Sequence, residues 1–116
     1  MKRIIFLLSV IIISGCVNPN TYRVDQDIEA SFTTTKSVPD TQECILAAWQ
    51  RQPLLMQITS QKIGKYHSVL AVGDNVDVYT DNGVTVVNYH SLRTDTDYLD
   101  VMDGKSKRMA GIKSCL

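Results

Sequence analysis

The chain contains 116 residues, 44% of them hydrophobic and 21% charged, which suits one small domain and not a wholly disordered chain. Twelve Lys and Arg balance twelve Asp and Glu, so the chain lacks the cationic surplus with which proteins neutralise nucleic-acid phosphates. Composition therefore argues against a nucleic-acid-binding protein.

The first segment of the chain reads as a secretory signal. Lys2 and Arg3 precede an apolar run over residues 4–13. This run is shorter than the ~18 residues of a membrane-spanning helix, but it matches the ~7–15 residues of a signal-peptide core. A core helix that is apolar on every side would need burial all around, which so small a domain does not provide. Residues 1–15 are therefore predicted to be a signal peptide that is removed.

The signal ends in Ile13-Ser14-Gly15-Cys16. Here the chain resembles the precursors of bacterial membrane lipoproteins, whose lipobox is an aliphatic residue, two small residues and a cysteine. The resemblance implies that a signal peptidase cuts between Gly15 and Cys16. It also implies that the Cys16 thiol receives diacylglycerol and that the new amine is acylated, with palmitate as a typical chain. Two or three acyl chains, at ~0.8 kcal/mol per buried CH₂, anchor a protein stably.

The residues after the lipobox bear on location. Val17 and Asn18 stand where many enteric lipoproteins of the inner membrane carry an aspartate. The resemblance thus implies the outer membrane, with the domain facing the periplasm, and the inner membrane or cell surface as alternatives. Ordinary signal cleavage with a free Cys16 is the other alternative.

Residues 16–39 are predicted to be a lipidated N-terminus and a flexible tether. Residues 17–40 are rich in Asn, Thr, Ser, Asp and Pro, and a flexible chain of this length spans about 25–30 Å. The alternative is that residues 30–35 add an edge strand to a sheet. Without residues 1–15, which include Lys2 and Arg3, ten cations face twelve anions, a net charge of −2.

A helix is predicted from Asp40, which stands three residues before Glu43 in the arrangement of a capping box. Ile45 and Trp49 follow at helical spacing, and Trp49 is expected in the core. Pro53 should end the helix near residue 51 or 52.

Short β-prone runs follow over residues 54–60, 66–72, 76–80 and 84–90, and residues 96–102 are a candidate fifth strand. Asn82-Gly83 tolerates positive φ and makes residues 76–90 the most secure hairpin. Residues 105–116 predict a short amphipathic helix, with a last strand as the alternative because of Gly111. The expected fold of residues 40–116 is α+β: a helix, a four- to five-stranded antiparallel meander and a short C-terminal helix on one face.

Cys44 and Cys115 are predicted to form a disulfide, since lipidation of Cys16 leaves them as the two remaining thiols in an oxidising compartment. The bridge would close a loop of about 70 residues and stabilise a small domain by about 2–4 kcal/mol. Two buried free thiols are the alternative. Neither cysteine has the neighbouring His or Cys-x-x-Cys spacing of a reactive thiol.

Catalytic and metal sites are not predicted, and no cofactor is expected beyond the covalent lipid. The chain has no Gly-x-Ser-x-Gly elbow, and its two histidines, His67 and His90, lie in predicted strands as partly exposed residues. His67 and Ser68 should point to opposite faces of a strand, and a metal site on His67 and His90 would need a third ligand.

Charged and aromatic residues cluster in the second half of the chain. The acidic cluster lacks the spacing of a calcium loop and is expected at a solvated edge: Asp95, Asp97, Asp100 and Asp103-Gly104. A basic stretch then pairs with it or meets lipid headgroups, lipopolysaccharide phosphates or an anionic partner: Lys105, Lys107, Arg108 and Lys113. Four tyrosines are expected to pack across strands or to form a partner-binding surface: Tyr66, Tyr79, Tyr89 and Tyr98.

The sequence favours a non-catalytic cell-envelope lipoprotein that acts as a lipid-anchored binding or accessory module for an envelope protein or polymer. The alternative is a periplasmic inhibitor or exclusion factor, similar in plan to lysozyme inhibitors or to proteins that exclude phage or plasmids. Such a protein would present an exposed loop, either Asp81-Asn82-Gly83 or residues 92–97. An assembly role predicts a contiguous apolar patch instead. A cell-wall-acting enzyme is the least favoured class.

Overall fold

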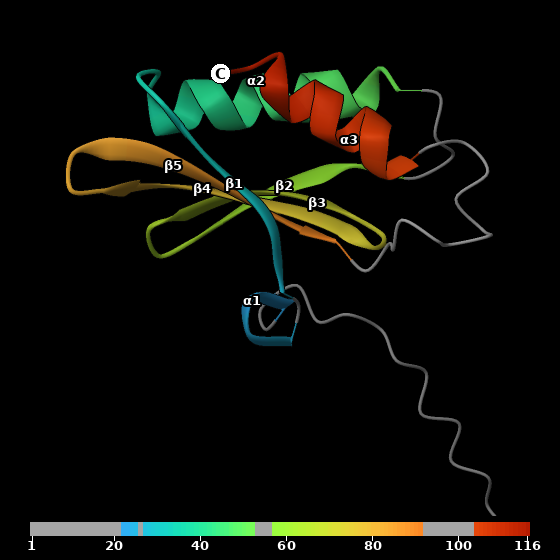
Figure 1. The fold of residues 1–116 in the computed structure, drawn as a ribbon, viewed down its shortest axis with the longest axis horizontal. Helices are drawn as coiled ribbons and strands as arrows, with labels where there is room; N and C mark the ends of the chain where they lie inside the picture. The colour runs from blue at the N-terminus through green and yellow to red at the C-terminus, as the bar shows by residue number, and fades with distance from the viewer. Residues whose placement is uncertain (1–21, 26, 53–56, 92–103) are drawn as a thin grey trace, which may run out of the picture.

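The computed structural model describes residues 22–25, 27–52, 57–91 and 104–116. They form an α+β fold in which two helices cover one face of an antiparallel sheet and a short helix lies on the other face (Figure 1). The predicted fold class is confirmed. In chain order the elements are α1 (Tyr22–Asp25), β1 (Ile28–Thr34), α2 (Val38–Gln50), β2 (Thr59–Ile63), β3 (Tyr66–Ala71), β4 (Asp74–Asp81), β5 (Val84–Ser91) and α3 (Gly104–Lys113).

The five strands lie in the order β1-β5-β4-β3-β2, so β2 to β5 are a meander and β1 is added beside β5. The predicted hairpin is the β4–β5 pair, in which Asp81 faces Val84 across a two-residue turn. Asn82 and Gly83 adopt φ of 49° and 77°, as a type I′ turn requires. The predicted strand over residues 54–60 is displaced, because β2 runs from Thr59 to Ile63.

The tether prediction for residues 16–39 is wrong for residues 28–34, because they form β1, and the edge-strand alternative is confirmed. Phe32 lies opposite Val87 and Thr34 opposite Thr85, and alternate residues of β1 turn toward the helices. This pairing is antiparallel to a strand more than fifty residues away, so local composition carried little sign of it. The candidate strand over residues 96–102 lies outside the described residues.

Helix α2 begins at Val38, two residues before the predicted start, and its N-cap is Ser37 instead of Asp40. The Ser37 hydroxyl accepts the backbone N–H of Asp40 at 3.3 Å. Pro39 fits the first turn because its missing N–H would have had no partner in the helix there. The helix ends at Gln50, close to the position that Pro53 predicted.

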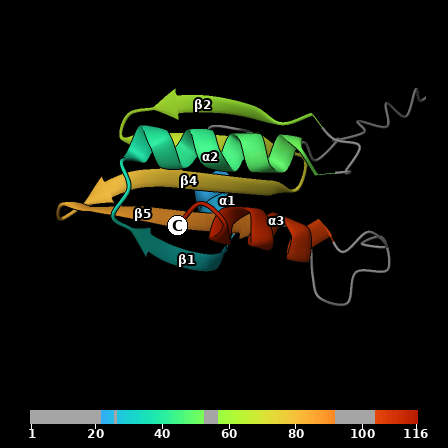
Figure 2. The same ribbon diagram turned by 90° about the horizontal axis from the view of Figure 1, so that it is seen from above.

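The core lies between the sheet and the two long helices. Figure 2 shows α2 above the β2–β4 side of the sheet and α3 above the β5–β1 side. The fully buried core residues include Ile45, Trp49, Val69, Val76, Val78, Val87, Tyr89 and Ile112. The Trp49 ring meets Tyr89 edge-on with ring centroids 6.2 Å apart, and its indole N–H donates to the carbonyl of Arg108 at 3.1 Å. The core role predicted for Trp49 is confirmed.

The disulfide predicted between Cys44 and Cys115 is present, with Cα atoms 5.7 Å apart. It joins α2 to the segment that follows α3. The C-terminal end is therefore fixed to the first long helix, and the prediction of a C-terminal helix on that face is confirmed.

Candidate functional site

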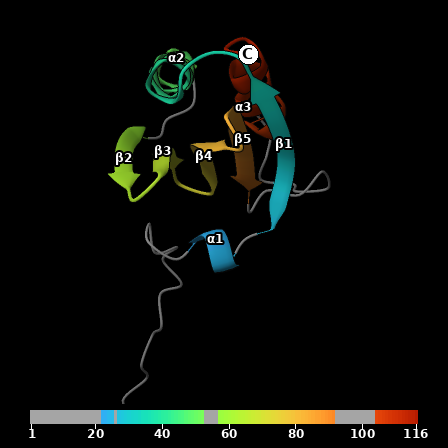
Figure 3. The ribbon, with the colours of Figure 1, turned by 90° about the vertical axis from the view of Figure 1, so that its left-hand side faces the viewer.

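The face of the sheet opposite α2 and α3 carries a row of polar side chains. We call it the outer face; Figure 3 shows α1 against it. Ser68 of β3, Asp77 of β4, Asn88 of β5 and Ser31 of β1 follow one another across four strands in register. Their neighbours Val76, Val78 and Val87 point into the core. Strand alternation thus places a carboxylate at the centre of the outer face.

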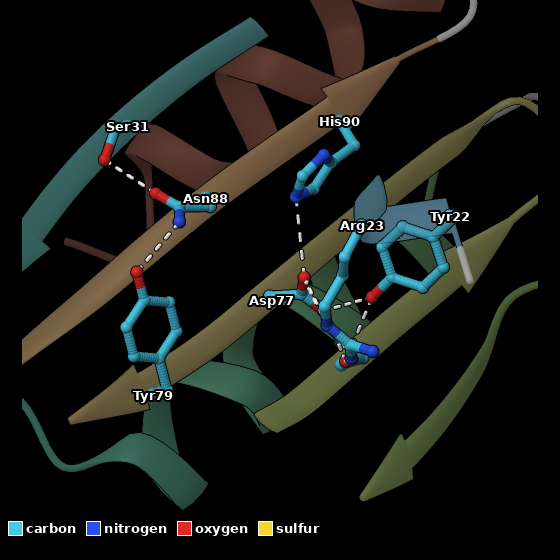
Figure 4. Close-up of polar contacts among 8 residues, drawn as sticks. Tyr22, Arg23, Ser31, Asp77, Tyr79, Asn88 and His90 are labelled. Atoms are coloured by element: carbon cyan, nitrogen blue, oxygen red, sulfur yellow. Dashed lines mark hydrogen bonds and ion pairs between the residues drawn. The ribbon is translucent and has the colours of Figure 1, made fainter. Parts of the chain in front are cut away.

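Asp77 gathers hydrogen-bond donors from four residues, and these five residues form the outer-face cluster: Tyr22, Arg23, Ser68, Asp77 and His90. The Asp77 carboxylate accepts from the Tyr22 hydroxyl, from Ser68 Oγ at 2.6 Å and from Arg23 Nη2 at 2.8 Å. Arg23 Nε lies 2.8 Å and His90 Nε2 lies 3.5 Å from its second oxygen (Figure 4). The cluster joins α1 to three strands of the sheet.

Burial makes these contacts strong. Asp77 is 1% exposed and Tyr22 is fully buried. Burial alone would raise the pKa of Asp77, but the hydrogen bonds from His90, Ser68, Tyr22 and Arg23 outweigh it, so the pKa lies below its ordinary value. Burial and the neighbouring Asp77 carboxylate raise the pKa of the Tyr22 hydroxyl. The pair is therefore stable as an ionised carboxylate that accepts a hydrogen bond from a neutral phenol.

A second row of the outer face lies beside the cluster. This tyrosine row consists of Ile63, Tyr66, Tyr79 and Val86 on four neighbouring strands, as the strand register places them. Tyr66 and Tyr79 meet edge-on with centroids 5.2 Å apart, which confirms cross-strand packing for these two tyrosines. The Arg23 guanidinium lies 4.2 Å from the Tyr66 ring centroid and so links α1 to the row.

The side chains of one lysine and one asparagine contact the tyrosine row. The Lys65 ammonium lies 5.3 Å from the Tyr66 centroid and 4.9 Å from that of Tyr79. The Tyr79 hydroxyl accepts from Asn88 Nδ2 at 3.0 Å, and Asn88 Oδ1 accepts from the Ser31 hydroxyl at 2.7 Å. These contacts hold both rings in place on the outer face.

A buried polar group also lies on the helix side of the sheet. Arg108 of α3 is fully buried, and its Nη1 donates to Gln52 Oε1 at 2.8 Å while its Nε lies 3.9 Å from Asp74. The guanidinium also lies over the Trp49 ring at 4.9 Å. Arg108 is therefore buried, and the alternative that it meets lipid headgroups, lipopolysaccharide phosphates or an anionic partner is wrong for this residue. Lys105 forms an ion pair with Glu29 of β1.

The Ser, His and Asp of the outer-face cluster do not form a catalytic triad. In a triad the histidine lies between the serine and the carboxylate, whereas here Asp77 lies between Ser68 and His90. The Ser68 hydroxyl donates a hydrogen bond to a carboxylate whose pKa is low, and Tyr22 covers the Ser68 hydroxyl. This arrangement fixes a helix and does not activate a nucleophile.

One prediction for the two histidines is confirmed and another is wrong. His67 and Ser68 do lie on opposite faces, since His67 is opposite the core residue Val78. His90, predicted as partly exposed, is 3% exposed, because α1 covers it and Tyr22 meets its ring edge-on at 5.5 Å. His67 and His90 are thus on different faces, and the described residues contain no group of three or more acidic, His or Cys side chains that could hold a metal ion.

Several predicted positions lie outside the described residues. They are Gly15 and Cys16, the acidic residues Asp95, Asp97, Asp100 and Asp103, Tyr98 and the loop 92–97. Sequence reasoning missed the outer-face cluster. Asp77 between two valines was the one available signal, because a charge in the middle of a β-prone run needs a partner.

Comparison with known proteins finds no matching family model, no matching curated protein and no matching solved structure. In the part of the chain that the structure describes, no helix is long and apolar enough to cross a membrane.

Proposed function

We propose that the protein is a non-catalytic, lipid-anchored module of the bacterial cell envelope that binds an envelope protein or polymer. The observation that carries this proposal is the Cys44–Cys115 disulfide. It uses two of the three cysteines of the sequence, and the third is Cys16 in Ile13-Ser14-Gly15-Cys16. A disulfide in so small a domain fits a compartment outside the cytoplasm, which is where a lipobox would direct the chain.

The geometry of the polar groups supports a binding role over catalysis. The serine and histidine nearest to a carboxylate serve to dock α1, and both are buried beneath it. Tyr66 and Tyr79 remain partly exposed on the same face and offer rigid contact area with hydrogen-bonding tips. A surface of this kind makes non-covalent contacts and carries out no chemical conversion.

The anchor is tested by growing bacteria that express the chain with labelled palmitate. The wild type should incorporate the label, and Cys16→Ser should not. The double variant Cys44→Ser/Cys115→Ser is the matched control, because it also lacks cysteines but keeps the lipobox, and it should still be labelled. Label in Cys16→Ser would contradict the proposal. Crosslinking in intact cells, followed by purification under denaturing conditions, identifies the partner.

The inhibitor alternative is favoured by one observation on the β4–β5 hairpin. Asp81, Asn82 and Gly83 at its turn are all exposed, as a loop that enters an enzyme cleft must be. Inhibition predicts that purified protein slows a cell-wall hydrolase and that Asp81→Ala with Asn82→Ala abolishes this effect. Unchanged hydrolysis by a panel of lysozymes would leave the accessory role as the function.

A further inference from the structure

We propose that the outer face of the sheet lies against the phospholipid headgroup layer of the membrane that holds the Cys16 anchor. The inference rests on the proposed lipidation and adds an orientation to it: the outer face toward the membrane, and α2 and α3 away from it. Three features of the described residues support it: the place where the chain leaves the domain, the chemistry of the tyrosine row and the cover on the opposite face.

The first feature is the docking of α1. Tyr22 is fully buried on the outer face and hydrogen-bonded to Asp77, so the chain is held at residue 22 in the middle of this face. Only six residue steps separate Tyr22 from Cys16, and an extended chain of that length reaches about 20 Å. A lipid on Cys16 would therefore hold the outer face close to the bilayer, closer than a tether ending at residue 39 would allow.

The second feature is the composition of the tyrosine row. Ile63 is 38% exposed, and Val84, two residues before Val86 on the same face of β5, is 44% exposed, so apolar side chains border the two partly exposed tyrosines. Lys65 stands over both rings. Tyrosine at the headgroup level, with lysine reaching the phosphates, is the usual composition of a membrane-contacting surface.

The third feature is the opposite face, which α2 and α3 cover. Helix α2 carries the exposed anions Asp40 and Glu43 and no Lys or Arg, which disfavours its contact with anionic headgroups. The outer face also has an exposed anion, Asp81 opposite Val84, but there the Lys65 ammonium stands over the neighbouring Tyr79 ring. Helix α3 ends in the exposed Lys113, which makes the α3 side the competing membrane contact. The two orientations place Val84 and Ala110, an exposed residue of α3, at opposite depths, so that labels at these positions distinguish them.

The test uses the full chain, expressed in bacteria with an environment-sensitive fluorescent amino acid at Val84 or at Ala110, and fed labelled palmitate. Protein extracted from the envelope is reconstituted into phosphatidylethanolamine and phosphatidylglycerol vesicles that contain headgroup-level spin-labelled lipid. The label at Val84 should lose most of its fluorescence to the quencher, while the label at Ala110 keeps most of it.

A variant tests whether α1 sets the orientation. The double variant Tyr22→Ala/Arg23→Ala removes the docking contacts of both residues, so that the chain is first held at Ile28, twelve residue steps after Cys16, and the reach doubles to about 40 Å. Quenching at Val84 should then fall while palmitate incorporation is unchanged. Thr33→Ala, an exposed outer-face change on β1, is the control and should leave quenching as in the wild type.

The outcomes separate the two proposals. If palmitate is incorporated but Ala110 is quenched more than Val84, the orientation is overturned, the lipid anchor stands, and the domain contacts the membrane through α3. If palmitate is incorporated but neither position is quenched, the orientation is again overturned and the anchor stands. The domain is then held off the bilayer, with the tyrosine row open to a protein partner. Absence of palmitate overturns the proposed function and the orientation together. Quenching at Val84 that Tyr22→Ala/Arg23→Ala leaves unchanged also overturns the inference, because α1 would then not determine the orientation.

Discussion

At the scale of single residues, Asp77 determines how the N-terminal part of the domain is held. A buried carboxylate is costly unless ion pairs and hydrogen bonds replace its water. Asp77 finds these partners on α1, through Tyr22 and Arg23, and on β3 and β5, through Ser68 and His90. A helix of four residues is not stable by its own propensity. The contacts of the Asp77 charge therefore hold α1 in one position on the sheet.

Asp77→Asn should therefore lower the free energy of unfolding at neutral pH by about 2–3 kcal/mol, because it removes charge-assisted hydrogen bonds and leaves Arg23 beside a neutral group. The dependence on pH identifies the cause. Because the pKa of Asp77 is lower in the folded state, its stabilisation is present above the ordinary value of 3.8 and is lost as the pH falls through the folded-state pKa. The difference between wild type and variant should narrow from pH 5 toward pH 2 in urea unfolding curves.

Asp81→Asn is the matched control, since Asp81 ends the same strand but is exposed. Its effect should stay within about 0.5 kcal/mol. A difference between wild type and Asp77→Asn that does not change with pH would show that the carboxylate's charge is not what stabilises the cluster.

At the scale of elements, the close approach of α3 to α2 explains why a glycine stands in a helix. A Cβ on Gly111 would lie 2.9 Å from Trp49 Cδ1 and 2.9 Å from Gln52 Nε2. The same contact brings Trp49 Nε1 to the carbonyl of Arg108 and Gln52 Nε2 to the carbonyl of Lys107 at 2.5 Å. Gly111 therefore lowers helix propensity but permits the packing of the two helices.

Gly111→Ala should lower the free energy of unfolding by about 1–2 kcal/mol. The gain in helix propensity, at most about 1 kcal/mol, is smaller than the cost of overpacking against the buried Trp49 ring, about 1–3 kcal/mol. Thermal unfolding followed by circular dichroism measures the change. Ser106→Ala, at an exposed position of α3, changes helix propensity without changing the packing of α3 on α2. It should leave the free energy of unfolding equal or slightly higher. An increase in the free energy of unfolding for Gly111→Ala would show that α2 and α3 can move apart enough to fit the methyl group without losing packing energy.

The elements that were predictable from the sequence are those with local signals. The turn at Asn82-Gly83 and the spacing of Ile45 and Trp49 in α2 are read within a few residues of chain. The β1–β5 pairing and the Tyr22–Asp77 contact join residues more than 50 positions apart, and the sequence around one partner does not indicate the other. The contacts that bring α1 into the outer-face cluster join residues 45 or more positions apart, which is why sequence reasoning found the helix and the hairpin but not the site.

At the scale of the whole molecule, the fold brings the C-terminal end of the chain to its first strand and first long helix. The Thr34 hydroxyl at the end of β1 donates to the carbonyl of Leu116 at 3.1 Å. Cys44 near the middle of α2 is bonded to Cys115 across 71 positions. The disulfide thus closes the chain from the middle of α2 to Cys115 into one loop, and β1, which lies outside the loop, contacts its end through Thr34.

Replacing both cysteines in Cys44→Ser/Cys115→Ser should lower the free energy of unfolding by about 2–4 kcal/mol, because an open chain of this length has far more unfolded conformations than a closed one. Urea unfolding of the variant and of wild type, with and without reductant, measures the effect. Cys16→Ser should unfold like wild type, since it leaves the bridge in place. A reduced wild type as stable as the oxidised protein would mean that packing of α3 on α2, and not the covalent closure, holds the C-terminus. The domain would then keep its fold in a reducing compartment, and the argument from the disulfide to the cell envelope would lose its physical basis.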